Sequence, residues 1–267
     1  YYVSFNIEFS KEMDLKISSE KLDISKSIGI YLNAYTIAVS KEMEALFKGK
    51  HQNQKSISLK HHISNGANDR KALKYAKAIK VLERKQSKRV LKAKKDKSKS
   101  KTKLGANHKK SQKKLNRKTK KVSDQKRDLY HKISKTLTES FELIAVEDLK
   151  TKNMSKSSKG NENVHGKKVK QKSGLNRTIL NASFYQFSAM LKYKQTMLND
   201  THYIKFAPKY TTLEWSKGGC RDKNNRLKQD RFECTECGFQ INPDIQASQK
   251  ILKRGLEVFG LGTSLCT

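Results

Sequence analysis

The sequence predicts a mixed α/β fold in which a long basic helical segment interrupts the sheet-forming part of the chain. Short apolar runs with strand character occur at residues 27–40, 141–149 and 203–207, and segments with helical periodicity lie between and after them. Residues 70–132 hold 27 Lys/Arg and 4 Asp/Glu, a net charge of +23. At 267 residues, the chain is long enough for one good core with an accessory module.

The strands are expected in the short apolar runs. Residues 1–9 alternate apolar and polar positions like an exposed strand, and residues 27–40 (SIGIYLNAYTIAVS) predict a buried strand followed by a second one. Residues 141–149 (FELIAVEDL) predict a strand that ends in two acids, a usual position for catalytic carboxylates. Residues 203–207 (YIKFA) predict a further strand that stops at Pro208. Because the chain starts with Tyr1 in a strand-like segment, we expect it to be part of a longer protein.

The helices are expected from apolar residues at helical spacing. In the basic segment, two such stripes flank a Lys/Ser-rich break at residues 94–103 and predict a helical hairpin: Leu73, Ala76, Ile79 and Leu82, then Leu129, Ile133 and Leu137. The alternative is a solvated or disordered basic run, which the apolar stripes disfavour. Residues 176–198 predict one helix, residues 151–173 an aperiodic loop, and Asp244 opens a last helix.

The charge of the chain points to a polyanionic partner. Lys and Arg number 59 against 25 acidic residues, a net charge of +34, so we expect nucleic acid. An anionic membrane is disfavoured, because the sequence has no run of about 18 apolar residues. The start does not resemble a signal peptide, so we expect a cytoplasmic protein, associated with the nucleoid if the source is bacterial. Nothing in the sequence predicts an oligomeric state.

The nucleic-acid contacts are assigned collectively to exposed positions of the basic segment, since phosphate contacts tolerate substitution. The six residues selected are Lys77, Arg84, Lys88, Arg117, Lys121 and Arg127. Tyr75, Tyr130 and Tyr185 could stack on bases, but aromatic residues at helical spacing usually pack in the core, so they are left out of the predicted interface.

Two carboxylates and a group of cysteines are candidates for metal chemistry. Two-metal phosphodiester hydrolysis needs several converging carboxylates, and Glu147 and Asp244 are the best candidates. The residues alone favour a simpler role for Asp244, as the cap of its helix. Cys234 and Cys237 have half of the spacing of a zinc ribbon, with Cys220 upstream, whereas a structural zinc site needs four ligands. Cys266 stands apart and is interpreted as a small apolar residue.

The order of several motifs resembles the TnpB family of transposon-encoded RNA-guided nucleases across essentially the whole chain. The matching segments are GIYL (29–32), DQKRDLYHKIS (124–134), FELIAVEDL (141–149), NRTILNASFYQFSAMLKYK (176–194), APKYTT (207–212), ECTECGF (233–239) and NPDIQASQKIL (242–252). The resemblance implies an RNase H-like (RuvC) mixed α/β sheet with a basic helical-hairpin insertion and a zinc-ribbon insertion. It also implies a guide RNA and double-stranded target DNA as partners.

The resemblance also implies an Asp, Glu, Asp catalytic set, which this chain departs from. Glu147 and Asp244 match the second and third acids, but Tyr31 takes the place of the first, and Asn33 replaces a glycine. A phenol is neutral near pH 7, so Mg²⁺ is not expected to support cleavage. Trp215 and Gly218 replace the first cysteine pair of the ribbon, so zinc binding is expected to be weak or absent. Cys220 lies two positions further on and would need a loop shift to contribute.

These departures lead to three hypotheses and a division of the chain. The leading one is an RNA-guided DNA-binding protein, without enzyme activity, that acts as a nuclease-inactive transcriptional repressor. The alternatives are a decayed transposon relic without a selected role and a residual RNA-guided DNA endonuclease with a substitute acid such as Asp23 or Asp148. The expected segments are 1–25 (end of an upstream β-rich domain), 26–69 (first RuvC part), 70–138 (basic helical insertion), 139–208 (second RuvC part), 209–241 (degenerate zinc ribbon) and 242–267 (last RuvC helix and tail).

Overall fold

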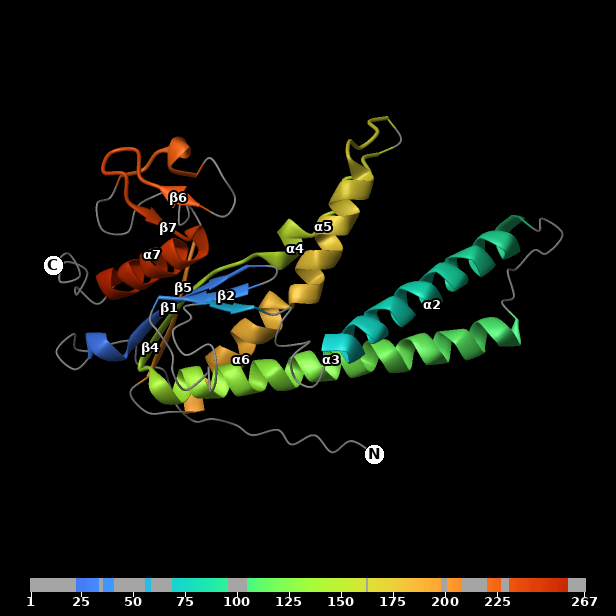
Figure 1. The fold of residues 1–267 in the computed structure, drawn as a ribbon, viewed down its shortest axis with the longest axis horizontal. Coiled ribbons are helices and arrows are strands. Elements are labelled where there is room, and N and C mark those ends of the chain that lie inside the picture. Colours follow the sequence, from blue (N-terminus) through green and yellow to red (C-terminus); the bar gives the residue numbers. More distant parts are fainter. Residues whose placement is uncertain are drawn as a thin grey trace.

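A five-stranded mixed sheet lies at the centre of the fold (Figure 1). The computed structural model describes residues 23–33, 36–40, 56–58, 69–95, 105–161, 163–197, 201–207, 220–226 and 231–258. The strands are β1 (Ser27–Leu32), β2 (Thr36–Val39), β3 (Ser56–Ser58), β4 (Leu143–Glu147) and β5 (His202–Phe206). Their order across the sheet is β3-β2-β1-β4-β5, with β2 antiparallel to both β1 and β3, and β4 parallel to both β1 and β5.

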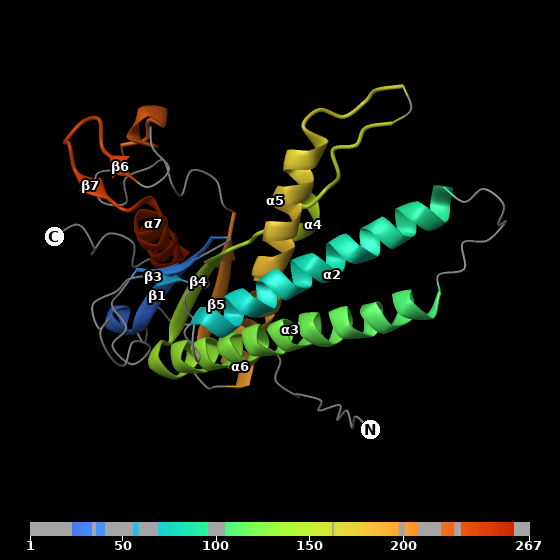
Figure 2. The same ribbon diagram turned by 45° about the vertical axis from the view of Figure 1, so that its right-hand side comes forward.

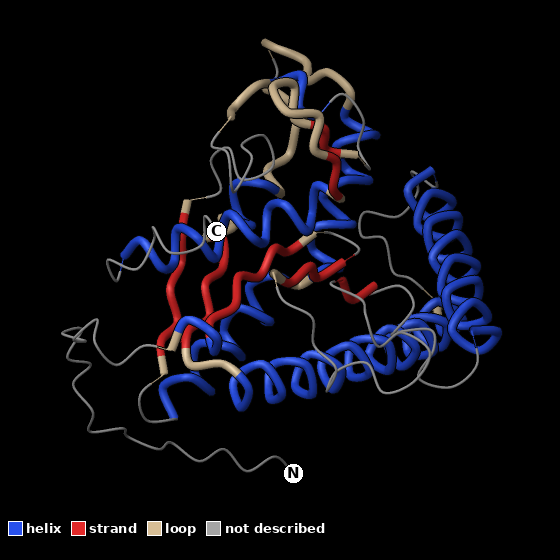
Figure 3. The backbone as a smooth tube through the Cα atoms, turned by 60° about the vertical axis from the view of Figure 1, so that its left-hand side comes forward, coloured by secondary structure: helices blue, strands red, loops and turns tan. Residues whose placement is uncertain are grey.

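This sheet confirms the predicted mixed α/β class, and helices cover both of its faces (Figure 3). The apolar runs at 27–40, 141–149 and 203–207 form β1, β2, β4 and β5, as predicted. The strand predicted at residues 1–9 lies outside the described residues. β4 is buried along its whole length, which agrees with its unbroken apolar sequence.

The two faces of β1 contact different helices because its side chains alternate. Ile28, Ile30 and Leu32 belong to the large apolar core. On the other face, Gly29 lies against α7 (Pro243–Val258), where a Cβ would be only 2.1 Å from the Ser248 carbonyl oxygen. The missing side chain of Gly29 therefore allows α7 to lie directly on β1.

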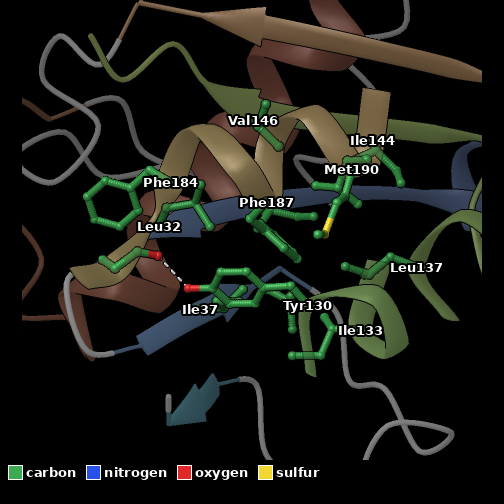
Figure 4. Close-up of a cluster of buried hydrophobic side chains, with 14 of the residues drawn as sticks. Leu32, Ile37, Tyr130, Ile133, Leu137, Ile144, Val146, Phe184, Phe187 and Met190 are labelled. Carbon is green, nitrogen blue, oxygen red and sulfur yellow. Dashed lines mark hydrogen bonds between the residues drawn. The ribbon is translucent and has the colours of Figure 1, made fainter. Parts of the chain in front are cut away.

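The large core joins the sheet mainly to two helices, α3 (Ala106–Ser140) and α6 (Phe184–Met197). Figure 4 shows their side chains meeting those of β1, β2 and β4. The ring of Tyr130 from α3 lies 5.1 Å from that of Phe187 from α6, centroid to centroid. The labelled core residues are Leu32, Ile37, Tyr130, Ile133, Leu137, Ile144, Val146, Phe184, Phe187 and Met190. The second apolar stripe of the basic segment, on α3, thus enters this core.

The basic segment forms two long helices, α2 (Asp69–Lys95) and α3, which lie side by side and extend away from the sheet (Figure 2). The Arg89 guanidinium donates to the carbonyl oxygen of Asn107 at 2.9 Å, and the Gln86 amide donates to that of His108 at 3.4 Å. These contacts tie α2 to the first turn of α3. In the part of the chain that the structure describes, no helix is long and apolar enough to cross a membrane.

The region after β4 differs from the prediction. Residues 151–173 were expected to be a loop, but they include α4 (Thr151–Met154) and the beginning of α5 (Val169–Ala182). The single helix expected at 176–198 is two helices, because Ser183 between α5 and α6 adopts the left-handed conformation (φ 51°). Lys126 and Tyr130 of α3 hold this break. The Lys126 ammonium donates to Ser183 Oγ at 2.8 Å, and the Tyr130 hydroxyl donates to the Ala182 carbonyl.

Candidate carboxylate site and nucleic-acid interface

The predicted carboxylates meet at the edge of the sheet where β1 and β4 end. Ile30 pairs with Val146 in the parallel ladder, so Tyr31 and Glu147 come next on adjacent strands. Asp244 reaches the same edge from the first turn of α7. The fold therefore brings together Tyr31, Glu147 and Asp244, although Tyr31 and Asp244 are more than two hundred residues apart in the sequence.

The electrostatics of Tyr31 reflect this proximity. Burial is the main cause that raises the pKa of Tyr31 to about 12, followed by the negative charges of Glu147 and Asp244. Arg226 acts in the opposite direction through its positive charge and a hydrogen bond to the phenol. Near neutral pH, Tyr31 is thus a neutral group beside two carboxylates and one guanidinium. Within the described ranges, no three His, Cys, Asp or Glu side chains converge to hold a metal ion.

Asp244 is held by Asn33 and Thr36, beside the ends of β1 and β2, rather than by its own helix. The Asn33 amide nitrogen donates to Asp244 Oδ2 at 2.9 Å, and the Thr36 hydroxyl donates to the same oxygen at 3.1 Å. The cap of α7 is Asn242, whose side-chain oxygen accepts from the Asp244 N–H at 2.9 Å. The capping role that the residues alone favour for Asp244 is therefore wrong, because Asn242 performs it.

Glu147 is the last residue of β4, and its side chain is only 4% exposed. A buried carboxylate requires compensating partners, so this position is costly for an acid without a specific role. The chain continues directly into α4, whose C-terminal end is held by α5. The Lys172 ammonium donates to the Met154 carbonyl at 2.7 Å, and the Asn176 amide donates to that of Ser155 at 2.8 Å.

The six predicted nucleic-acid contacts, Lys77, Arg84, Lys88, Arg117, Lys121 and Arg127, are all exposed on α2 and α3. Arg127 also forms an ion pair with Asp124, at 3.3 Å. Their role in binding stays a prediction. Of the three tyrosines set aside in the sequence, Tyr130 is buried as expected, whereas Tyr185 is 76% exposed, and the side chain of Tyr75 lies outside the described residues.

The three C-terminal thiols lie around a tight turn beside the ribbon of β6 (Phe232–Glu233) and β7 (Gln240–Ile241), which follows a short helix at Lys223–Arg226. Cys220 and Cys234 are buried and Cys237 is exposed. Burial tends to raise the pKa of Cys234, but hydrogen bonds from Cys237, Glu236 and Cys220 leave it below its ordinary value. Burial raises the pKa of Cys220, which also hydrogen-bonds with Cys234.

The structure places two of the predicted thiols, Cys220 and Cys234, together. Cys220 lies beside Cys234, and the Asn225 amide holds the Cys220 backbone, donating to its carbonyl at 3.3 Å. Trp215, Gly218 and Cys266 lie outside the described residues. The metal-binding role of Cys234, Cys237 and Cys220 stays a prediction.

Three functional candidates were missed in the sequence. Arg226 is the last residue of the short helix at Lys223–Arg226 and carries no motif that marks it, and the contacts of Asn33 and Thr36 with Asp244 join residues separated by 211 and 208 positions. The only signal was the polar Asn33 directly after the apolar strand that contains Tyr31. That signal indicated only that Asn33 replaces a glycine of the family, and it did not reveal the hydrogen bond between Asn33 and Asp244.

Comparisons with known proteins give the relatives of this chain. A family model described as the Cas12f1-like TNB domain matches residues 184–251. InsQ of Escherichia coli (strain K12), named as a candidate RNA-guided DNA endonuclease, is 33% identical over 156 residues, which are 58% of this chain and 39% of InsQ. TnpB-like protein L79 of Acanthamoeba polyphaga mimivirus is 31% identical over 155 residues, which are 54% of this chain and 26% of that protein. The chain thus spans less than half the length of these relatives.

A solved structure titled as a Cas12f1–sgRNA–target DNA complex aligns with 86% of this chain and 50% of its own, at 16% identity and a TM-score of 0.47. The name of InsQ contradicts one expectation, namely that the protein is not an enzyme. That expectation is wrong, because it was based on Tyr31 alone, whereas the relatives point to an enzyme family. The matched domain and the relatives named TnpB-like agree with the order of the motifs, so the comparisons confirm the resemblance of this chain to TnpB-like proteins.

Proposed function

We propose that this chain is an RNA-guided DNA-binding protein in which the α2–α3 pair contacts the guide RNA. The observation that carries the proposal is the exposed basic surface of α2 and α3, within a segment of net charge +23. Its relative InsQ is named as an RNA-guided DNA endonuclease candidate, which supports the same reading. In RNA-guided recognition, base pairing reads the sequence while Lys and Arg hold the nucleic-acid backbone.

The domain assignment follows from this proposal. The strand order β3-β2-β1-β4-β5 supports an RNase H-like (RuvC) domain built from residues 26–69, 139–208 and 242–267. The α2–α3 pair then corresponds to the basic helical insertion at 70–138, and residues 209–241 correspond to the zinc ribbon. Guide RNA and double-stranded target DNA are the partners that this assignment requires.

The carboxylate edge is the place where phosphodiester chemistry would occur. Glu147 and Asp244 Oδ1 are the groups that would hold a divalent cation, since Mg²⁺ is commonly bound by one or two carboxylates and substrate phosphates. Oδ1 makes no hydrogen bond to another described residue, whereas Oδ2 is occupied by Asn33 and Thr36. A bound cation would supply charge stabilisation for the attacking and leaving oxygens. Tyr31 contributes no negative charge there.

Repression of transcription is the biological outcome that we propose for target binding. A complex bound at a promoter would block RNA polymerase because it occupies the site. This outcome therefore depends on nucleic-acid binding by the basic helices and on the guide RNA. An endonuclease is the second candidate, favoured by the buried Glu147 close to Asp244 and by the name of InsQ. The two outcomes share the same binding step.

The first experiment is sequencing of the nucleic acid that co-purifies with the chain, washed with increasing salt. We expect one discrete RNA that survives washing and a matching DNA site. Neutralising Arg84, Lys88 and Arg117 to Gln should release the RNA at lower salt, with a salt slope smaller by about 2, because each lost phosphate contact removes about 0.7. The control substitutes the exposed Lys192 and Lys205 and should retain it. Heterogeneous, salt-labile nucleic acid would sink the proposal and indicate a relic.

The second experiment tests the carboxylate edge with Tyr31→Asp, which adds a third acid. With guide RNA and Mg²⁺ or Mn²⁺, this variant should cleave matched DNA faster than the natural chain. Tyr31→Asn, which adds a side chain of the same size without charge, and Tyr31→Asp combined with Glu147→Gln should give no gain. If Tyr31→Asp binds its target without any gain in cleavage, the edge is not a metal site.

A further inference from the structure

The segment that follows Glu147 forms a basic projection, called here the α4–α5 arm (residues 150–182). The chain passes through α4, extends outward to a narrow hairpin and returns along α5, which projects from the sheet (Figure 1). Residues 150–177 contain nine Lys/Arg and a single acid, Glu162. This charge is separate from that of α2 and α3, and it begins at the carboxylate edge.

The backbone of the arm is held in a defined conformation. Isolated β pairing joins Gly160 to His165, and the Gly166 N–H donates to the Lys159 carbonyl at 2.9 Å. The bonds of Lys172 and Asn176 to the end of α4 fix α5 against the chain that leaves Glu147. An aperiodic loop would spread its charges over many positions, whereas this arm presents them in a fixed array.

The lysines of the arm differ from those that stabilise the fold. Lys126, Lys172 and Lys194 donate to backbone carbonyls or hydroxyls of neighbouring elements. The other basic side chains of the arm are exposed and make no ion pair with another described residue: Lys150, Lys152, Lys156, Lys159, Lys167, Lys168, Lys170 and Arg177. Such a run of like charges repels itself unless a polyanion neutralises it.

An exposed aromatic ring follows the arm directly. Tyr185, in the first turn of α6, is 76% exposed, and Leu180 at the end of α5 is 62% exposed. Tyrosine rings in a basic setting stack on bases, and stacking requires bases that are unpaired. A duplex offers phosphates but no free base face, so the ring favours a single strand over a double helix.

We propose that the α4–α5 arm binds single-stranded DNA, with its phosphates on the exposed lysines and a base on Tyr185, beside the Glu147 edge. The inference rests on the proposed function, because pairing of a guide RNA with duplex DNA displaces one strand. The α2–α3 pair takes the RNA in that scheme, which leaves a second basic surface for the displaced strand. The arm is thus the element that brings DNA to the carboxylates.

The experiment measures binding of a fluorescent oligo-dT to the full chain by anisotropy across a salt series. Lys159, Lys167 and Lys168 substituted together by Gln should reduce the slope of log affinity against log salt by about 2, since each phosphate contact on a single strand contributes about 0.7. The matched control is the triple substitution of Arg84, Lys88 and Arg117 on α2 and α3, which removes the same charge. It should release guide RNA and leave the oligo-dT slope unchanged.

The aromatic contact is tested separately. Tyr185→Ala should weaken oligo-dT binding between about 5-fold and about 150-fold, the range expected for one lost base stack. Tyr185→Phe keeps the ring and should retain the affinity for oligo-dT. If the hydroxyl group made the contact instead, Tyr185→Phe would lose affinity as well. Far-UV circular dichroism checks that each variant is folded.

Two results would overturn the inference. One is an unchanged oligo-dT affinity in the arm variant, and the other is an equal loss of binding for a duplex of the same length, which would mean that the arm does not select single strands. Failure of the proposed function looks different, because it would appear as no discrete co-purifying RNA and no effect of the α2–α3 substitutions on RNA.

Discussion

Gly29→Ala is the substitution with the most sharply defined consequence in this fold. The added Cβ would lie 2.1 Å from the Ser248 carbonyl oxygen, 2.6 Å from the Leu252 nitrogen and 2.9 Å from Leu252 Cβ. Ordinary contacts begin at 3.4 Å. Since the two closest atoms belong to the backbone of α7, no side-chain rotation relieves the clash, and the helix must retreat from β1 by about 1.3 Å.

The magnitude follows from the packing of α7, whose Ala247, Ile251 and Leu256 are fully buried. Overpacking a core by one methyl group costs about 1–3 kcal/mol, and backbone contacts place this case near 3 kcal/mol. The loss of conformational freedom in the unfolded chain offsets about 0.4–1 kcal/mol of that cost. We expect a net loss of about 2–3 kcal/mol in the free energy of unfolding.

Urea unfolding followed by circular dichroism at constant salt measures this loss. Gly174→Ala is the matched control, because it lies inside α5 with nothing within 4 Å of its added Cβ and should stabilise the protein by about 1 kcal/mol. The retreat of α7 should also lengthen the Asn33–Asp244 hydrogen bond beyond about 3.5 Å. An unfolding midpoint of Gly29→Ala equal to that of the natural chain would refute the close packing of α7 on β1.

Three further predictions concern single side chains. Because the pKa of Tyr31 is raised to about 12, its neutral phenol contributes its full share of stability below pH 10, and this share is lost as the pH rises through 12. The phenolate absorbance of the natural chain should therefore differ from that of Tyr31→Phe only well above pH 10. A difference already present at pH 10 would contradict the raised pKa. Because Asn33 and Thr36 donate to one oxygen, Asn33→Ala with Thr36→Val should cost at least about 0.5 kcal/mol more than the sum of the single variants in a double-mutant cycle, and additivity would argue against shared support. Lys126→Met should lower the free energy of unfolding by about 1–2 kcal/mol and leave RNA binding unchanged. Unchanged stability together with weaker RNA binding would show that Lys126 contacts RNA and does not stabilise the fold.

The sequence predicted the parts of the fold that rest on local patterns. The apolar runs located β1, β2, β4 and β5, and the stripe with Ile133 and Leu137 placed α3 against the core. The family motifs identified Glu147 and Asp244, which the structure brings to one edge. These predictions succeed because burial on one face leaves a periodic trace in the sequence.

The remainder depends on contacts that leave no such trace. The break at Ser183 arises from Lys126 and Tyr130 on another helix, so the periodicity of residues 176–198 could not reveal it. Asn242, two residues before Asp244, was equally suited to cap α7, and only the turn of Asn33 and Thr36 decides between them. Exposure of Tyr185 likewise depends on where α5 ends.

The length of α3 gives these contacts a mechanical meaning. Its 35 residues span about 52 Å, yet its buried apolar side chains are confined to Tyr130, Ile133 and Leu137 near one end. The helix is therefore anchored in the core only near its C-terminal end. A force on its N-terminal half would rotate it about that anchored end. Lys126 and Tyr130 of α3 also bond to the junction between α5 and α6, so a change in the orientation of α3 would act directly on the direction of the α4–α5 arm.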